Sequence, residues 1–97
     1  MYLYSVEFQR DEKKSRENLR KHGLSFEDAH LVFDGDTVTF LDDRFGYGEE
    51  RCIPLGELDG RVVLMVYTLR GETIRIISMR KANGREKKTY QERLGKN

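Results

Sequence analysis

The chain has 97 residues, of which 18 are Lys or Arg, 17 are Asp or Glu and two are His, so its formal net charge is +1. This length suffices for a single domain, residues 1–97, with one modest core. The longest apolar run, Val62 to Tyr67, is far shorter than the roughly 20 residues that span a bilayer. One cysteine, Cys52, and two histidines exclude an internal disulfide and a zinc-ligand cluster. The N-terminus lacks the basic segment of a signal peptide. We therefore expect a small cytoplasmic domain that needs no cofactor or metal.

Charge is unevenly distributed along the chain. Residues 10–22 hold six basic and three acidic residues, whereas residues 23–60 hold two basic and ten acidic ones. Residues 75–97 are again basic, with eight basic and two acidic side chains. A basic C-terminal third suits a polyanion such as nucleic acid, or an acidic protein partner. The alternative is that these charges only line solvated helix faces.

The N-terminal third predicts a strand and then two helices. Residues 2–8 alternate in a β-prone pattern. Asp11 to His22 is typical of a helix, and Gly23 is a natural residue just past its end. A second helix begins at Ser25, where Ser25 to Asp28 resembles a capping box. Its apolar stripe consists of Phe26, Ala29, His30 and Phe33.

Four strands and a helix are predicted in the remainder of the chain. The strands cover residues 37–40, 49–55, 61–69 and 73–79. Pro54 lacks an amide donor and places the second of these at an edge or at a bulge. The solid apolar run in the third predicts a central strand. A last helix opens at Asn83, with Glu86 completing a capping box, and it docks through Tyr90 and Leu94. The order β-α-α-β-β-β-β-α predicts an α+β domain with an antiparallel β-sheet.

Arg75 is the first candidate for chemistry, because a cation in an otherwise apolar strand must face a cleft or a carboxylate. Arg80 and Lys81 follow at the end of that strand, and Arg51 follows Glu50 in the preceding hairpin. Such arginines could bind phosphate, because their guanidinium groups form bidentate bonds to its oxygens. Arg75 and Arg80 are five positions apart, so they share a face only if the strand ends or bulges near Met79.

Two alternatives stay open at this point. The arginines could instead belong to a structural network, for example an ion pair between Glu50 and Arg75. His22 could cap the end of its helix by bonding to the last carbonyls, or it could transfer protons near neutral pH. His30 is expected on the helix surface.

Several motifs together resemble those of one protein family. They are Asn18 to Ala29 followed by Val32 and Phe33, then Gly48 to Arg51, then Arg75 to Ala82, and finally Glu86 to Tyr90. In this order they resemble the BrnT toxins, and the resemblance runs from about Phe8 to Leu94.

The resemblance implies a compact RelE-like fold and a ribonuclease that inhibits translation. It also implies a protein antitoxin, typically a BrnA-like ribbon-helix-helix protein, through which alone the complex would contact operator DNA. RNA cleavage without metal requires an activated 2′-hydroxyl, stabilised phosphorane charge and a protonated 5′-oxygen. Arg75, Arg80 and Arg51 would stabilise that charge, and His22 or Glu50 would move protons. The RNA-binding residues would be Lys21, Lys81, Arg85 and Lys88.

The competing hypothesis is a binding domain with no catalytic activity. Its acidic middle and basic ends would then form a docking surface for protein or nucleic acid. If Arg75, Arg80 and His22 face one open cleft, the nuclease is favoured. If they point apart or sit in closed ion pairs, the binding domain is favoured.

Overall fold

The computed structural model describes residues 7–42 and 50–95. Their elements, in chain order, are β1 (Glu7–Gln9), α1 (Glu12–His22), the 3-10 turn η2 (Phe26–Asp28), α2 (Ala29–Val32), β2 (Val38–Asp42), β3 (Arg51–Leu58), β4 (Arg61–Arg70), β5 (Thr73–Lys81) and α3 (Gly84–Arg93). Of the predicted first strand, residues 2–6 lie outside the described part, as do residues 43–49, which include the start of the Gly48 to Arg51 motif.

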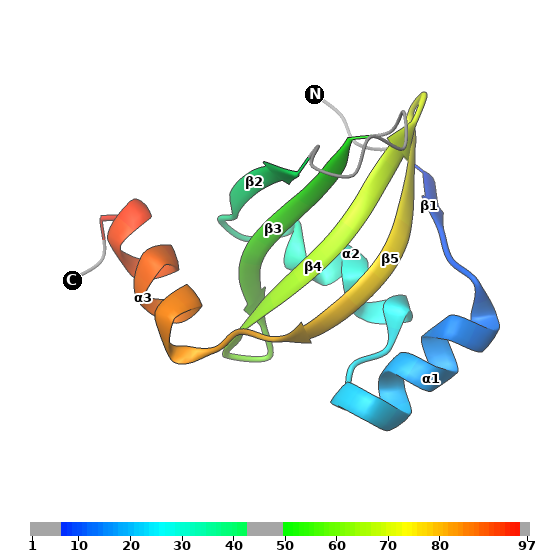
Figure 1. The fold of residues 1–97 in the computed structure, drawn as a ribbon, viewed down its shortest axis with the longest axis horizontal. Coiled ribbons are helices and arrows are strands. Elements are labelled where there is room, and N and C mark those ends of the chain that lie inside the picture. The colour runs from blue at the N-terminus through cyan, green and yellow to red at the C-terminus, as the bar shows by residue number, and fades with distance from the viewer. Residues whose placement is uncertain (1–6, 43–49, 96–97) are drawn as a thin grey trace.

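The five strands form one mixed sheet in the order β1-β5-β4-β3-β2 (Figure 1). Four of them pair antiparallel, as predicted, and β4 is the central strand. The sheet is thus largely antiparallel, and the exception is at one edge, where β1 runs parallel to β5 with Phe8 beside Ile74. The long stretch of chain between β1 and β5 includes three other strands and allows this return in the same direction.

The ends of α1 and α3 follow the local sequence. The Asp11 carboxylate accepts hydrogen bonds from the first turn of α1, and Gly23 ends the helix with φ of 72°. Asn83 and Glu86 form the predicted capping box at the start of α3. The box predicted at Ser25 is only half formed, since its hydroxyl accepts from the Glu27 N–H without a reciprocal bond.

Pro54 lies in β3, which is an interior strand between β2 and β4, and the register of β3 is the same on both sides of it, so neither the edge position nor the bulge predicted for it is found. Pro54 pairs with Thr39 of β2, while the register between β3 and β4 passes from Cys52 directly to Leu55. The missing amide donor is thus accommodated by a gap in one ladder.

Two residues later Gly56 lets α2 approach, because a Cβ there would lie 2.7 Å from the Val32 side chain.

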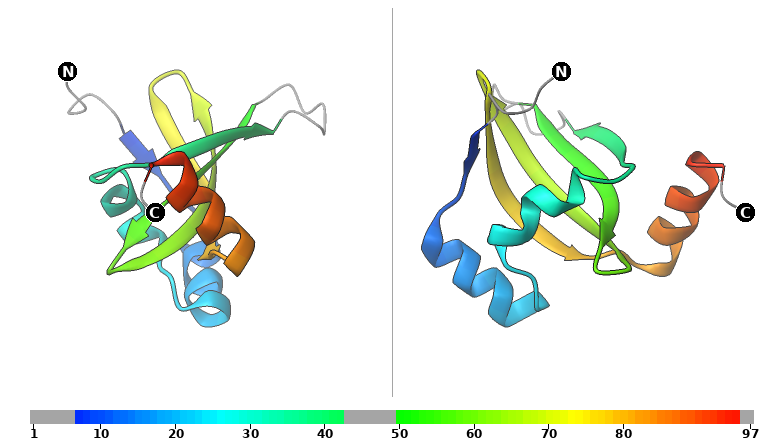
Figure 2. Two further views of the ribbon diagram at one scale, coloured as in Figure 1. Left: turned by 90° about the vertical axis from the view of Figure 1, so that its left-hand side faces the viewer. Right: turned by 180° about the vertical axis from the view of Figure 1, so that it is seen from behind.

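The sheet buries a different cluster on each face. One face packs against η2 and α2 through a core that includes Val32, Met65 and Met79. α2 lies behind the sheet in Figure 1 and in front of it in the right-hand view of Figure 2. The other face carries a smaller cluster in which Tyr90 of α3 packs with Leu55. Tyr90 is only 4% exposed and half-buried Leu94 joins it, which confirms the predicted docking of this helix.

Candidate active site

A bulge in β5 decides which way its arginines face. Val66 of β4 pairs with Ser78 and Tyr67 pairs with Ile76, so Ile77 is an extra residue between them. Residues paired across a sheet share a face, and Arg75 pairs with Thr68 while Arg80 pairs with Leu64. Thr68 and Leu64 are four positions apart in a regular strand, so Arg75 and Arg80 lie on the same face. The predicted condition for their convergence, a bulge near Met79, is met at Ile77.

We call this side of the sheet the arginine face, defined by Arg51, Thr68, Arg75 and Arg80. It is the face that Figure 1 shows toward the viewer, opposite α2. Arg51 of β3, Thr68 of β4 and Arg75 of β5 are direct partners in adjoining ladders and form one row across the sheet. Asp42 and Gln9 extend the row at its two ends. Neighbouring strands are about 4.8 Å apart, so the backbones of Arg51 and Arg75, which lie two strands apart, are roughly 10 Å from each other.

Arg75 is half-buried and makes no hydrogen bond or ion pair with any residue in the described ranges 7–42 and 50–95. In particular, the ion pair with Glu50 that a structural network predicts does not form. Arg75 instead lines a depression of about 270 Å³ together with Gln9, Arg10 and Asp11. The pKa of the Asp11 carboxyl is lowered chiefly by its hydrogen bond from the Lys14 N–H, with a smaller attraction from Arg75. This guanidinium is therefore available for an added anion.

Arg80, in contrast, is held in a closed ion pair. Its two terminal nitrogens donate to the two carboxylate oxygens of Glu86 at 2.9 and 2.8 Å. Glu86 also accepts from the Asn83 N–H, so the pair ties the end of β5 to the start of α3. Arg80 is the main cause that lowers the pKa of the Glu86 carboxyl. A phosphate that bound both terminal nitrogens of Arg80 would have to replace Glu86.

His22 lies apart from the row of arginines. It is the last residue of α1 and lines a second depression, of about 300 Å³, with Lys21, Asn18 and the bulge residues Ile77 and Ser78. Arg75 does not line this depression. No hydrogen bond joins His22 to another described residue, so the expected capping of the last carbonyls is not seen. Arg75, Arg80 and His22 therefore do not share one cleft.

The remaining candidates lie outside the row of arginines. Glu50 is exposed and directly precedes Arg51, the half-buried first residue of β3. Arg85 lines an opening of about 270 Å³ between α3 and the sheet, beside Leu64. Lys88 is exposed on α3, and Lys81 is exposed at the end of β5, where it lines an opening with Lys87.

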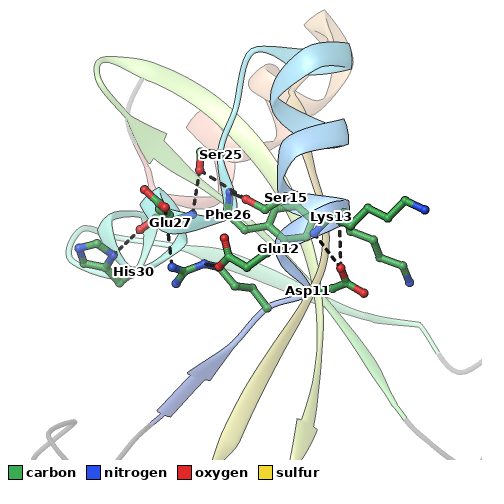
Figure 3. Close-up of polar contacts among 10 residues, drawn as sticks. Asp11, Glu12, Lys13, Ser15, Ser25, Phe26, Glu27 and His30 are labelled. Carbon is green, nitrogen blue, oxygen red and sulfur yellow. Dashed lines mark hydrogen bonds and ion pairs between the residues drawn. The ribbon is translucent and has the colours of Figure 1, made fainter.

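Polar contacts fix α1 against η2 beside this region (Figure 3). The Phe26 N–H donates to the Ser15 hydroxyl at 3.0 Å. Arg10 contacts Glu12 at 2.8 Å and Glu27 at 3.8 Å. His30 is exposed, as predicted, and its Nδ1 lies 3.0 Å from the carbonyl oxygen of Glu27. Arg10, which lines the depression beside Arg75, is thus paired with acidic side chains of α1 and η2.

Two residues that the sequence did not single out matter here. Asn18 is buried in α1. Its side-chain amide donates to the Met79 carbonyl and accepts from the Met79 N–H, which are the two hydrogen bonds that a neighbouring strand would make. Thr68 is 1% exposed, and its Oγ1 has no hydrogen-bond partner. For Thr68, the available signal was a hydroxyl directly after the apolar run Val62 to Tyr67. For Asn18, no local pattern indicates its partner.

The described residues contain no group of three or more His, Cys, Asp or Glu side chains that could hold a metal ion. None of the helices in the described part of the chain is long and apolar enough to cross a membrane.

The structure is that of a small α+β protein whose mixed sheet has a row of arginines on one face. A family model described as "Ribonuclease toxin, BrnT, of type II toxin-antitoxin system" matches residues 11–86, and the chain belongs to this family. The family suggested by the sequence motifs is thus confirmed. Membership makes RNA the substrate and a protein antitoxin the partner. No curated protein matches the chain.

Proposed function

We propose that this protein is a metal-independent endoribonuclease that acts in the cytoplasm and inhibits translation. In this reaction the 2′-oxygen attacks the adjacent phosphorus and the bond to the 5′-oxygen breaks. The products are a 2′,3′-cyclic phosphate and a free 5′-hydroxyl, and one proton moves from the first oxygen to the second. The observation that carries the proposal is Arg75, an unpaired guanidinium on an open sheet face in a ribonuclease toxin family.

Arg75 and Arg51 would stabilise the charge that develops on the phosphorane, which is commonly the largest contribution that fixed donors make. Arg80 would join them by exchanging Glu86 for the phosphate. Glu50, one residue before Arg51, or His22 would transfer the protons. Lys21, Lys81, Arg85 and Lys88 would hold the RNA backbone through its phosphates. The fold would be of the RelE-like kind.

The test is cleavage of a defined RNA by the purified chain, with and without ribosomes, and with EDTA present. We expect cleavage that EDTA does not abolish, because the described residues offer no metal-ligand cluster. Arg75→Ala should lower the rate about 100-fold, the scale for loss of one preorganised donor. RNA left intact by well-folded wild-type protein under all these conditions would contradict the proposal.

The antitoxin would be a BrnA-like ribbon-helix-helix protein that covers the arginine face and α3, and the complex would reach operator DNA only through it. Its contacting segment would be acidic with a few apolar anchors. Charge complementarity would make association fast and salt-sensitive. A complex that leaves Arg75 and α3 exposed, or an association rate unchanged between roughly 0.05 and 0.5 M salt, would favour inhibition from a distant surface.

One observation favours the second candidate, a non-catalytic binding domain. The Arg80–Glu86 pair is closed, and His22 opens into a separate depression. In such a domain Arg75→Ala would weaken RNA binding, but the wild-type protein would leave RNA uncut.

A further inference from the structure

Thr68 is the buried hydroxyl at the centre of the arginine face. Its residue exposure is 1%, and Oγ1 is the one buried side-chain oxygen or nitrogen without a hydrogen-bond partner in the part of the chain that the structure describes. Buried hydroxyls are nearly always hydrogen-bonded, because leaving one unpaired forfeits its hydration. An unpaired one calls for a specific explanation.

The neighbours of Thr68 supply that explanation. In the sheet it pairs with Arg51 on β3 and with Arg75 on β5, so cationic side chains arise on both sides of it on the same face. With its backbone about 4.8 Å from that of Thr68, Arg75 can bring its guanidinium group to the space above the hydroxyl. Thr68 thus lies beside the unpaired Arg75 guanidinium, and its own hydroxyl has no hydrogen-bond partner among the protein groups around it.

We propose that Thr68 is a phosphate-binding residue whose hydroxyl donates to a phosphate oxygen of the RNA, beside Arg75. This rests on the proposed function, because it assigns a residue to the same substrate. A phosphate oxygen accepts several hydrogen bonds at once, and guanidinium groups and a hydroxyl are common donors to it. Thr68 is buried in the free protein, so phosphate binding would require the side chains above its hydroxyl to move aside.

The opposite end of the row fits an anion less well. Asp42 is the strand partner of Arg51 on this face, and its carboxylate adds negative charge there. The side facing β5 has instead the unpaired guanidinium of Arg75. We therefore place the phosphate on the Arg75 side of Thr68.

The discriminating variant is Thr68→Val, which keeps the shape of the side chain and replaces the hydroxyl by a methyl group. Since that hydroxyl has no partner in the free protein, Thr68→Val should leave the unfolding midpoint unchanged or raise it. It should weaken binding of inorganic phosphate, followed by NMR at constant ionic strength, by about tenfold, the scale of one hydrogen bond to a charged group. Thr68→Ser keeps the hydroxyl and should bind phosphate as the wild type does. Thr39→Val is the matched control, because Thr39 lies on the opposite face of edge strand β2 and is exposed.

RNA cleavage measured on the same four proteins separates this inference from the proposed function. Loss of cleavage and of phosphate affinity in Thr68→Val alone supports both. Wild-type protein that leaves RNA intact but binds phosphate through Thr68 contradicts the nuclease and keeps the phosphate site. Phosphate affinity in Thr68→Val equal to that of the wild type, or no saturable shift at the Thr68 methyl group of the wild type, overturns the inference whatever the cleavage assay shows.

Discussion

Arg75 and Arg80 share one face of the sheet although they are five positions apart, because Ile77 is accommodated as a bulge between them. The core on the other face shows the same shift, since Ile76 and Met79 are both buried in it with two residues between them. A regular strand would have turned one arginine into that core. The bulge therefore directs Arg75 and Arg80 to one face of the sheet, as bulges near functional sites often redirect side chains.

Arg75→Ala should reduce the salt dependence of RNA binding. An unpaired arginine that contacts one phosphate of a single strand contributes about 0.7 to the slope of log affinity against log salt concentration. We expect the slope to fall by about this amount when RNA binding is measured at several salt concentrations. Arg61→Ala, at an exposed position at the start of β4, serves as the control and should leave the slope unchanged. Equal slopes for the wild type and Arg75→Ala would remove Arg75 from the RNA contact.

The Arg80–Glu86 pair should contribute a pH-dependent part of stability. The pKa of Glu86 is lowered in the folded protein, first by its hydrogen bonds with Arg80, so the contribution is present above the unfolded pKa near 4.5. It is lost as the pH falls from there through the lower folded pKa. The side chains are 40% and 23% exposed, so a double-mutant cycle of Arg80→Ala and Glu86→Gln should give a coupling of only about 0.5–1 kcal/mol at pH 7. Urea unfolding of the four proteins between roughly pH 3 and 7 measures it, and a coupling that does not decline toward pH 3 would contradict the assignment.

The same two variants separate a catalytic from a structural role of Arg80. If Arg80 exchanges Glu86 for phosphate, Arg80→Ala should lower RNA cleavage about tenfold or more, while Glu86→Gln should leave it unchanged or raise it. If the pair only anchors α3, both variants should change cleavage equally.

Local sequence signals predicted the elements well where neighbouring residues decide the structure. The Asn83–Glu86 capping box and the ending of α1 at Gly23 both occur as expected. The turn between β3 and β4 also follows its two residues, because Asp59 and Gly60 have positive φ, 53° and 78°, which suits a two-residue hairpin.

Features that depend on distant residues could not be predicted in this way. The parallel pairing of β1 with β5 joins Glu7 to Thr73, and no local pattern specifies it. The bulge at Ile77 follows from packing of Ile76 and Met79 in one core, whereas alternation along the strand gave no reason to place it there. Glu86 was predicted as a cap, but its pairing with Arg80 was not, because that pairing depends on the path of the chain between the two residues.

The candidate site was predicted in composition more than in arrangement. Arg51 and Arg75 do share a row, whereas His22 opens elsewhere and Arg80 already has a partner. Thr68 was missed because a hydroxyl in an apolar strand shows its missing partner only once the neighbouring strands are in place.

Tyr90→Phe should destabilise the protein slightly and leave α3 docked. The Tyr90 hydroxyl donates to the Asp36 carbonyl at 3.0 Å, and its ring is buried with Leu55. Loss of the hydroxyl alone should cost about 1 kcal/mol in unfolding free energy. Tyr90→Ala also removes the ring and should cost about 3–4 kcal/mol. Amide hydrogen exchange within Gly84–Arg93 should accelerate in the second variant only, and equal exchange in both would show that α3 is held by other contacts.

Asn18→Ala should cause a large loss of stability, although Asn18 is not part of the arginine face. The Asn18 amide donates to the carbonyls of Leu24 and Met79 at 2.9 Å and accepts from the Met79 N–H at 3.3 Å. The variant leaves these buried backbone groups unpaired, and we expect a cost of about 2–4 kcal/mol in urea unfolding. Arg16→Ala, exposed on the same helix, should change stability by less than about 0.5 kcal/mol. Asn18→Asp keeps the acceptor but loses the donor, so it should also be destabilised. If Asn18→Ala were as stable as Arg16→Ala, the hydrogen bonds of Asn18 would contribute little to stability, and water would have to pair with the Met79 N–H and carbonyl instead.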